Sequence, residues 1–184
     1  MQQVQEEQKF GQALADFSLQ QVRNGIKLSL SQVLAGKKGA VVVFWSGVCS
    51  HCVRYDPFLN ALEARHPQLG VIAVASRHGE TLESIKTTVS ERGLKFPMVH
   101  DPGGKIAAAW STQQTPRAFL MDAERTLLYR GAIDNFKYPE DPEYVGYLEP
   151  AIDQFLKGDP IERTETASYG CAIQSVYYIL PRAL

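Results

Sequence analysis

The residues of this 184-residue chain best suited to chemistry are two cysteines, Cys49 and Cys52, with two residues between them. The pair follows a continuous apolar run at residues 40–45, and apolar residues at helical spacing come after it. In a Cys-X-X-Cys pair at the start of a helix, about one turn separates the two sulfurs, so they can form a disulfide. Unpaired N–H groups and the helix dipole favour the thiolate of the first cysteine and lower its pKa. This pattern predicts thiol–disulfide exchange, in which Cys49 attacks a partner's disulfide and Cys52 resolves the mixed disulfide.

The two intervening residues, Ser50 and His51, are expected to tune the redox potential of the pair. A protonated His51 would place positive charge beside Cys49 and stabilise the reduced thiolate form. A stabilised reduced form makes a stronger oxidant. The direction of electron flow stays open on these residues alone.

A zinc site and an inert pair of cysteines are the alternatives. Structural zinc takes about four ligands, and the chain holds no second Cys-X-X-Cys and no His-X-X-X-His. The three histidines His66, His78 and His100 share no spacing. We therefore predict no metal and no cofactor. The third cysteine, Cys171, is either a small buried apolar residue or an accessory or intermolecular redox thiol.

The surrounding sequence predicts alternating strands and helices. Asn24-Gly25 suits a hairpin turn, the run at 40–45 suits a strand buried on both faces, and Pro150 suits the first turn of a helix. The order predicts an α/β fold with a central mixed sheet flanked by helices, an N-terminal hairpin and a C-terminal extension. The expected strands are 16–19, 26–28, 40–45, 71–75, 96–99, 117–121 and 127–130, and the expected helices are 29–34, 50–65, 82–93, 104–110 and 149–157.

We predict one domain over residues 1–184, with its core at about 14–158 and an extension at 159–184. The extension is polar at first and becomes apolar again at residues 176–180. It could pack over the body of the domain or swap onto a neighbouring molecule.

Several motifs carry a resemblance to a known family. Residues 43–52, Val-Phe-Trp-Ser-Gly-Val-Cys-Ser-His-Cys, resemble the active-site strand and helix start of the thioredoxin-like superfamily. Pro57 matches the proline that kinks the active-site helix in that family, and Thr115-Pro116 resembles its cis-proline. The resemblance implies that Pro116 faces the cysteines and that the backbone of Thr115 pairs with an extended substrate.

Other segments resemble the redoxin branch of that superfamily, which holds the alkyl-hydroperoxide-reductase-like and TlpA/ResA-like proteins. These are the hairpin, residues 96–101 and residues 129–131, and the likeness covers about residues 16–158. Residues 164–173 resemble the C-terminal Gly-Cys-X-Ile element of peroxiredoxin-like members.

The chain departs from the family pattern at two positions. Thioredoxins carry a buried acid six residues before the first cysteine, and this chain has Val43 there, so the usual proton relay is expected to be absent or supplied elsewhere. Between the cysteines, His51 matches strong oxidases, and Ser50 replaces the usual residue after the first cysteine. By the same resemblance, Trp45 is expected to shield the disulfide on one side.

Two other functions stay open. Peroxiredoxins use Pro-X-X-X-Thr-X-X-Cys, and the corresponding positions before Cys49 are Val42 and Ser46. The serine could replace the threonine, but the proline is missing, which disfavours an antioxidant peroxidase. Thioredoxin-like domains can also serve as binding modules without turnover, although a pure scaffold needs no reactive pair of thiols.

Composition limits the partners. The chain is 45% hydrophobic and 21% charged, with a formal net charge of −1, which gives no global reason to expect nucleic acid. No apolar stretch approaches the roughly 20 residues of a membrane-spanning helix. We expect protein thiols or disulfides as partners, together with an upstream thiol electron donor or acceptor; the oligomeric state is left open.

Residues 1–8 lack the features of a signal peptide. We favour an extracytoplasmic protein whose signal was removed, with a cytoplasmic protein as the alternative.

Overall fold

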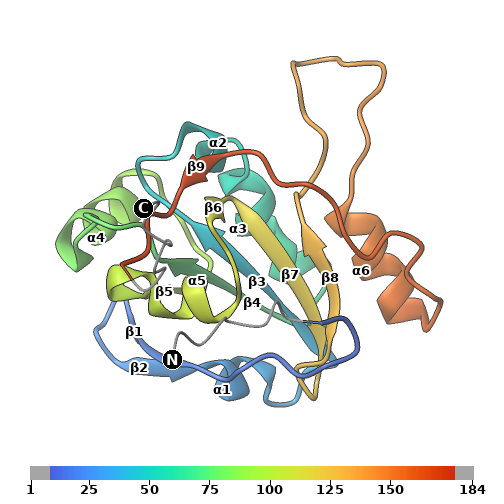
Figure 1. Cartoon of the computed structure of the whole chain (residues 1–184), viewed down its shortest axis with the longest axis horizontal. Helices are drawn as coiled ribbons and strands as arrows, with labels where there is room; N and C mark the ends of the chain where they lie inside the picture. The colour runs from blue at the N-terminus through green and yellow to red at the C-terminus, as the bar shows by residue number, and fades with distance from the viewer. Residues whose placement is uncertain (1–8, 177–184) are drawn as a thin grey trace, which may run out of the picture.

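The structure, a computed structural model, describes residues 9–176. Its centre is a seven-stranded sheet in the order β2-β1-β5-β4-β3-β7-β8 (Figure 1). The parallel pairs are β3 with β4 and β4 with β5, and the other pairs in this sheet are antiparallel. The strands are β1 Ser18–Gln21, β2 Lys27–Ser29, β3 Gly39–Trp45, β4 Leu69–Ala75, β5 Met98–His100, β7 Arg117–Asp122 and β8 Leu127–Gly131.

Strand β3 is buried along its whole length because helices cover both faces of the sheet. Side chains alternate between the faces of a strand, so Val41, Val43 and Trp45 lie in one apolar cluster and the residues between them lie in the other. The first cluster includes residues of α3 (Asp56–Arg65), α4 (Leu82–Glu91) and α6 (Leu148–Lys157). The second includes residues of α1 (Leu30–Leu34) and α5 (Lys105–Ala109), which follows the short 3-10 turn η1 (Pro102–Gly104).

These elements confirm the predicted α/β fold with a mixed sheet flanked by helices. The N-terminal hairpin forms as β1 and β2, paired from Ser18 opposite Ser29 to Gln20 opposite Lys27. Helix α1 begins with a capping box between Ser29 and Gln32, a pattern that satisfies free N–H groups at a helix start.

One predicted helix is wrong in its extent. The segment 50–65 is divided into α2 (Ser50–Val53) and α3 (Asp56–Arg65), with Pro57 in the first turn of α3. Proline lacks an N–H and cannot continue the hydrogen bonding of a preceding helical turn, whereas it fits the first turn of a new helix. The predicted active-site helix therefore begins as one short turn, with Cys49 as its N-cap and Cys52 inside it.

The C-terminal extension packs on the body of the same chain. Strand β9 (Cys171–Ala172) pairs antiparallel with β6 (Gln114–Thr115) in a separate two-stranded sheet. In Figure 1 the extension leaves α6, crosses the end of β7 and reaches β9 beside α2. Of the predicted apolar run at 176–180, residues 177–180 lie outside the described residues, as do residues 1–8.

Between residues 9 and 176, no helix is long and apolar enough to cross a membrane.

Candidate active site

The structure brings Cys49, Cys52 and Thr115 together. Cys49 ends the loop after β3 and is the N-cap of α2, and Cys52 lies within that turn. Both cysteines are fully buried, at 0% exposure. The Cys49 thiol donates a hydrogen bond of 3.3 Å to the backbone carbonyl of Thr115, which precedes Pro116 across a cis peptide bond. The nucleophile expected from sequence therefore lies directly against the expected docking edge.

The two cysteines differ in acidity. The Cys52 thiol donates a hydrogen bond to the Cys49 sulfur, and this is the largest effect lowering the pKa of Cys49, to about 4, despite its burial. Hydrogen bonds from Cys171 and from the Thr115 hydroxyl act in the same direction. Burial, followed by the hydrogen bond to Cys49, raises the pKa of Cys52 far above that of an ordinary thiol. The site therefore favours a thiolate on Cys49, which gives up its hydrogen bond to the Thr115 carbonyl when it ionises, and a protonated thiol on Cys52.

Cys171 is the third member of this sulfur cluster. Its residue in β9 lies opposite Thr115, and both its thiol and its backbone N–H contact the Cys49 sulfur. Burial and the neighbouring Cys49 raise the pKa of Cys171. All three cysteines are free thiols.

Trp45 lies at the end of β3 and is fully buried among the residues that pack with both cysteines. Its indole N–H donates a 3.2 Å hydrogen bond to Asp56. Arg92 from the end of α4 pairs with the same carboxylate, its Nε at 2.7 Å, and donates a 3.0 Å hydrogen bond to the backbone carbonyl of Gly47. This partly buried ion pair fixes the loop from Ser46 to Cys49 against α3.

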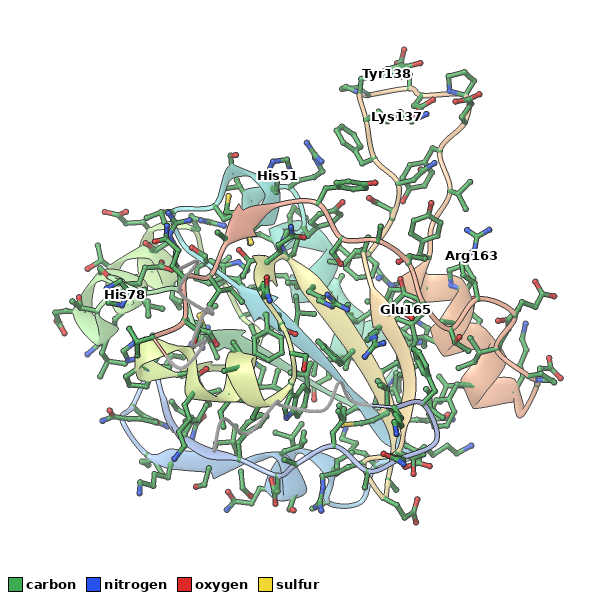
Figure 2. The ribbon with its side chains drawn as sticks, viewed as in Figure 1. His51, His78, Lys137, Tyr138, Arg163 and Glu165 are labelled. Carbon is green, nitrogen blue, oxygen red and sulfur yellow. The ribbon has the colours of Figure 1, made fainter. Side chains whose placement is uncertain are left out.

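The positions between the cysteines are exposed. Ser50 and His51 face solvent in α2, and Figure 2 shows His51 at the rim of the molecule beside β9. His51 also lines a cavity of about 440 Å³ together with Pro116, Tyr55, Asp134 and Tyr169. The hydroxyl of Tyr55 donates a hydrogen bond to Asp134. Residues 132–147, which carry Asp134, form the loop that projects from the body of the domain, with Lys137 and Tyr138 far out on it (Figure 2).

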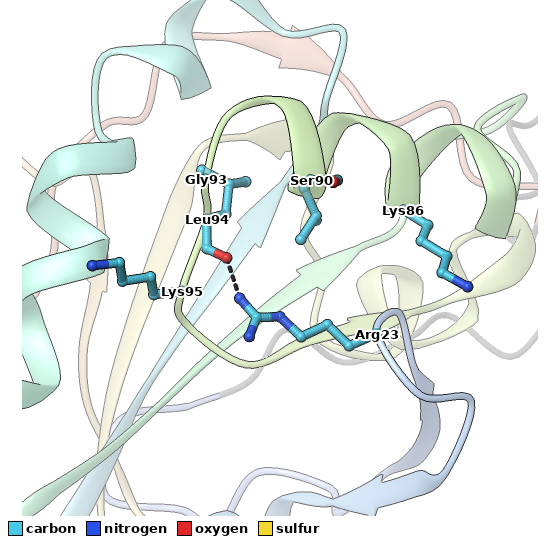
Figure 3. A pocket seen from close by; sticks show the side chains of 7 residues that line it. Arg23, Lys86, Ser90, Gly93, Leu94 and Lys95 are labelled. Atoms are coloured by element: carbon cyan, nitrogen blue, oxygen red, sulfur yellow. Dashed lines mark hydrogen bonds between the residues drawn. The ribbon is translucent and has the colours of Figure 1, made fainter.

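A second cavity, of about 430 Å³, lies away from the cysteines, between the turn after β1 and the end of α4 (Figure 3). Arg23 donates a hydrogen bond to the Leu94 carbonyl there, and Lys86 and Lys95 line its sides. It holds none of the predicted site residues.

The other histidines lie apart from the cysteines. His66 contacts Glu149 at 2.7 Å, and the backbone N–H of His78 donates to the carbonyl of Ile173. Within the described part of the chain, no group of three or more His, Cys, Asp or Glu side chains is placed to hold a metal ion.

Sequence reasoning missed three contributions to the site. It did not place Cys171 against Cys49, because 122 positions separate them (171 − 49) and only the β6–β9 pairing brings them together. It assigned Thr115 to substrate binding and missed the hydroxyl that contacts Cys49. It also missed the Asp56–Arg92 pair; an acid and an arginine on two separate helices give no local signal.

The sheet order, the cysteine pair at the end of β3 and the cis-proline opposite it define a thioredoxin-like fold. Solved structures agree: the chain superimposes on a secreted Mycobacterium tuberculosis disulfide oxidoreductase with a TM-score of 0.52 at 22% identity, covering 60% of this chain and 79% of that one. Residues 10–130 match the AhpC/TSA family. The chain belongs to this family.

Two further relatives cover different shares of the chain. A hypothetical protein from Sinorhizobium meliloti 1021 has a TM-score of 0.82 at 28% identity, and the match covers 94% of this chain and 98% of that one. The thiol-disulfide oxidoreductase ResA of Bacillus thuringiensis (strain Al Hakam) is 33% identical over 87 residues, which are 47% of this chain and 50% of the relative. The match thus spans about half the length of this curated relative. These likenesses confirm the expected redoxin and ResA-like branch.

Proposed function

We propose that this chain is a thiol–disulfide oxidoreductase that exchanges disulfides with protein thiols through Cys49 and Cys52. The Cys49 thiolate attacks one sulfur of a client disulfide, and the other client sulfur leaves as a thiolate. Cys52 then loses its proton and attacks Cys49, which forms the Cys49–Cys52 disulfide and releases the second client thiolate. The two cysteines lose two electrons to the client, and the reverse sequence oxidises a client dithiol.

The observation that carries the proposal is the difference in pKa between the two thiols. Only the thiolate is a nucleophile, and hydrogen bonds lower the pKa of Cys49 while burial raises that of Cys52. A buried, protonated Cys52 does not react with solvent oxidants and stays available to resolve the mixed disulfide. This argues against a binding module without turnover, which needs no such asymmetry.

A protein client suits the surroundings of Cys49 better than a small thiol. Val48 directly precedes Cys49, and Tyr169 lies two residues before Cys171; these large apolar side chains are 67% and 80% exposed and are available to a protein partner. The cavity beside Pro116 offers room for a client side chain next to the disulfide. The backbone of Thr115 would offer an edge to an extended client segment once β9, which pairs with it in this structure, moves away.

The same hydrogen bonds favour an oxidising role. They stabilise the reduced form through the Cys49 thiolate, and a stabilised reduced form raises the potential above the thioredoxin value of about −270 mV. Val43 is fully buried and supplies no proton acceptor to Cys52, so fast reduction by the thioredoxin route has no support at that position. An extracytoplasmic location, where client disulfides persist, suits this role, and fractionation of the source cells would test it.

The proposal is tested in the Cys171→Ser variant, which retains only the two predicted catalytic cysteines. Peptide mapping after mild oxidation should find a Cys49–Cys52 disulfide that a reductant reverses. The Cys52→Ser/Cys171→Ser double variant should accumulate mixed disulfides with a model protein that holds a disulfide, through attack of Cys49 on that disulfide, and Cys49→Ser should abolish exchange. Absence of the disulfide and of the mixed species would contradict the proposal and support a binding module.

An antioxidant peroxidase is the second candidate. The hydroxyl of Ser46, where peroxiredoxins have threonine, is buried, and the described structure gives it no hydrogen-bond partner. Its backbone carbonyl accepts from the Cys49 N–H at 3.3 Å. Peroxide consumption that needs both Cys49 and Ser46 would support this function; consumption unchanged in Cys49→Ser would exclude it.

A further inference from the structure

The C-terminal extension is held firmly upstream of Cys171. Residues 164–166 run beside the end of β8, where the backbone of Arg130 accepts from Thr166 at 3.2 Å and donates to Thr164 at 3.0 Å. The Arg130 guanidinium pairs with Glu165 at 2.7 Å, and the Thr166 hydroxyl accepts from the N–H of Ala132 at 2.9 Å. This side of the extension is therefore fixed to the sheet.

The extension is also anchored to the body of the domain downstream of Cys171. Ile173 is fully buried in the second apolar cluster, and its N–H donates to the Gln113 carbonyl at 2.9 Å. The Ser175 hydroxyl donates to the carbonyl of Gly104 at 2.6 Å. The segment between these anchors crosses the active site as a strap.

The strap occupies the edge of Thr115. In β9, Cys171 lies opposite Thr115 and Ala172 opposite Gln114. Gly170 approaches so closely that an added Cβ would lie 1.8 Å from the Thr115 carbonyl oxygen. Only glycine allows this contact, so the Gly-Cys sequence fits the strap to the same backbone edge that an extended client would use.

Cys49 is buried beneath the strap, and the strap's own Cys171 contacts it. Cys49 is 0% exposed, whereas Cys171 is half-buried and contacts Cys49 through its thiol and its N–H. Ala172, the next residue, is exposed, as expected because side chains alternate between the two faces of a strand. Of the two residues in β9, only Cys171 directs its side chain at Cys49.

We propose that Cys171 is a third redox thiol, and that β9 is an internal docking strand which delivers it to Cys49. The inference rests on the proposed exchange function. When Cys49 holds a mixed disulfide, Cys171 gives up its proton, attacks the Cys49 sulfur and forms a Cys49–Cys171 disulfide, and the partner's thiolate leaves. Cys52 can then attack Cys49 and release Cys171 as a thiolate, which moves the disulfide inward without further electron transfer. The two electrons come from cysteine thiols and go to the partner disulfide.

The test uses the reduced full-length Cys52→Ser variant with oxidised glutathione as the partner disulfide. We expect the chain to lose two hydrogen masses and peptide mapping to find Cys49 joined to Cys171, with little glutathione retained. In Cys52→Ser/Cys171→Ser, Cys49 should retain one glutathione. Equal retention of glutathione in both variants would overturn the proposal.

A matched control moves the thiol by one residue. In Cys52→Ser/Cys171→Ser/Ala172→Cys the thiol has nearly the same chain separation but points to the other face of β9. Because orientation determines effective concentration, the internal disulfide should form at least about tenfold more slowly. Gly170→Val in the Cys52→Ser background keeps every other cysteine and should slow it similarly. Unchanged rates in both variants would show that β9 does not deliver the thiol.

The outcomes separate the two proposals. A normal Cys49–Cys52 disulfide in Cys171→Ser, together with glutathione retained on Cys52→Ser, leaves the exchange function standing and overturns the role of Cys171. No reaction of Cys49 in any variant overturns both.

Discussion

The protonated thiol of Cys49 donates a hydrogen bond of 3.3 Å to the backbone carbonyl of Thr115, 66 positions away. This contact joins the start of α2 to the segment before the cis-proline, so the proposed nucleophile and the proposed docking edge lie against each other. A client that pairs with Thr115 would place its disulfide against Cys49. In this structure the chain's own strand β9 takes that place.

The first prediction concerns the thiolate of Cys49. Since hydrogen bonds lower the pKa of Cys49 to about 4, the ultraviolet absorbance of one thiolate should persist at neutral pH and disappear near that value. Cys52→Ala removes the strongest donor. A hydrogen bond to a charged group contributes about 1.5–3 kcal/mol, so the pKa should rise by about one to two pH units. The Cys49→Ser variant, which lacks the thiolate, is the control. A Cys49 pKa near 8.5 in the wild type would contradict this account.

The second prediction follows from the same shift and concerns stability. The pKa of Cys49 in the folded reduced chain lies below the roughly 8.5 of an unfolded cysteine. The thiolate therefore adds stability that is complete above the unfolded pKa and is lost as the pH falls toward 4. The free energy of unfolding of the reduced chain, compared with Cys49→Ser, should increase from about pH 4 to about pH 8.5. Chemical denaturation at several pH values measures it. A difference that does not change with pH would show that the folded chain does not favour the thiolate.

Local pattern was enough to predict the central elements of the fold. The run at 40–45 and the Asn24-Gly25 turn each have one strong structural interpretation, and both appear where expected. The division of the predicted helix 50–65 lies just before Pro57, and the sequence indicated it only as a kink, by resemblance. Asp56, the first residue of α3, accepts a hydrogen bond from Trp45, a contact that no local pattern reveals.

The site was predictable only where its residues are close in sequence. Cys49, Cys52 and the pair Thr115-Pro116 carry recognisable motifs. Cys171 was left with two interpretations because its partner lies across the fold, and the exposed position of His51 could not be read from its place between the cysteines. The position of Cys171 and the exposure of His51 depend on contacts between residues far apart in the sequence, which residue type alone does not reveal.

The third prediction concerns the partly buried ion pair of Asp56 and Arg92 behind the loop that leads to Cys49. Asp56 accepts hydrogen bonds from Trp45 and Arg92. Asp56→Ala leaves the partly buried Arg92 without its carboxylate and the buried Trp45 N–H without its acceptor. An unsatisfied buried donor costs about 1–3 kcal/mol. Urea unfolding should show this loss. The exposed Glu143→Ala, which removes only a surface pair with Lys137, should change stability by about 1 kcal/mol or less. Similar losses in both variants would argue against a structural role for Asp56.

The fourth prediction separates the two candidates for tuning the redox potential. The Thr115 hydroxyl contacts Cys49, whereas His51 is exposed. In the Cys171→Ser background, Thr115→Val should lower the potential by about 30–60 mV, because about 1.4 kcal/mol corresponds to 30 mV for two electrons. His51→Ala should lower it by less than half as much. Equilibration with glutathione buffers gives both values, and a larger effect of His51→Ala would return the tuning role to the histidine.

The most direct test of the central claim is the equilibrium between the Cys49–Cys52 disulfide and its two thiols in the Cys171→Ser variant, followed by peptide mapping across a series of glutathione buffers. The account predicts one reversible two-electron transition at a potential above about −270 mV, with Cys49 and Cys52 as the joined residues. A chain in which these two cysteines never join at any potential would contradict it.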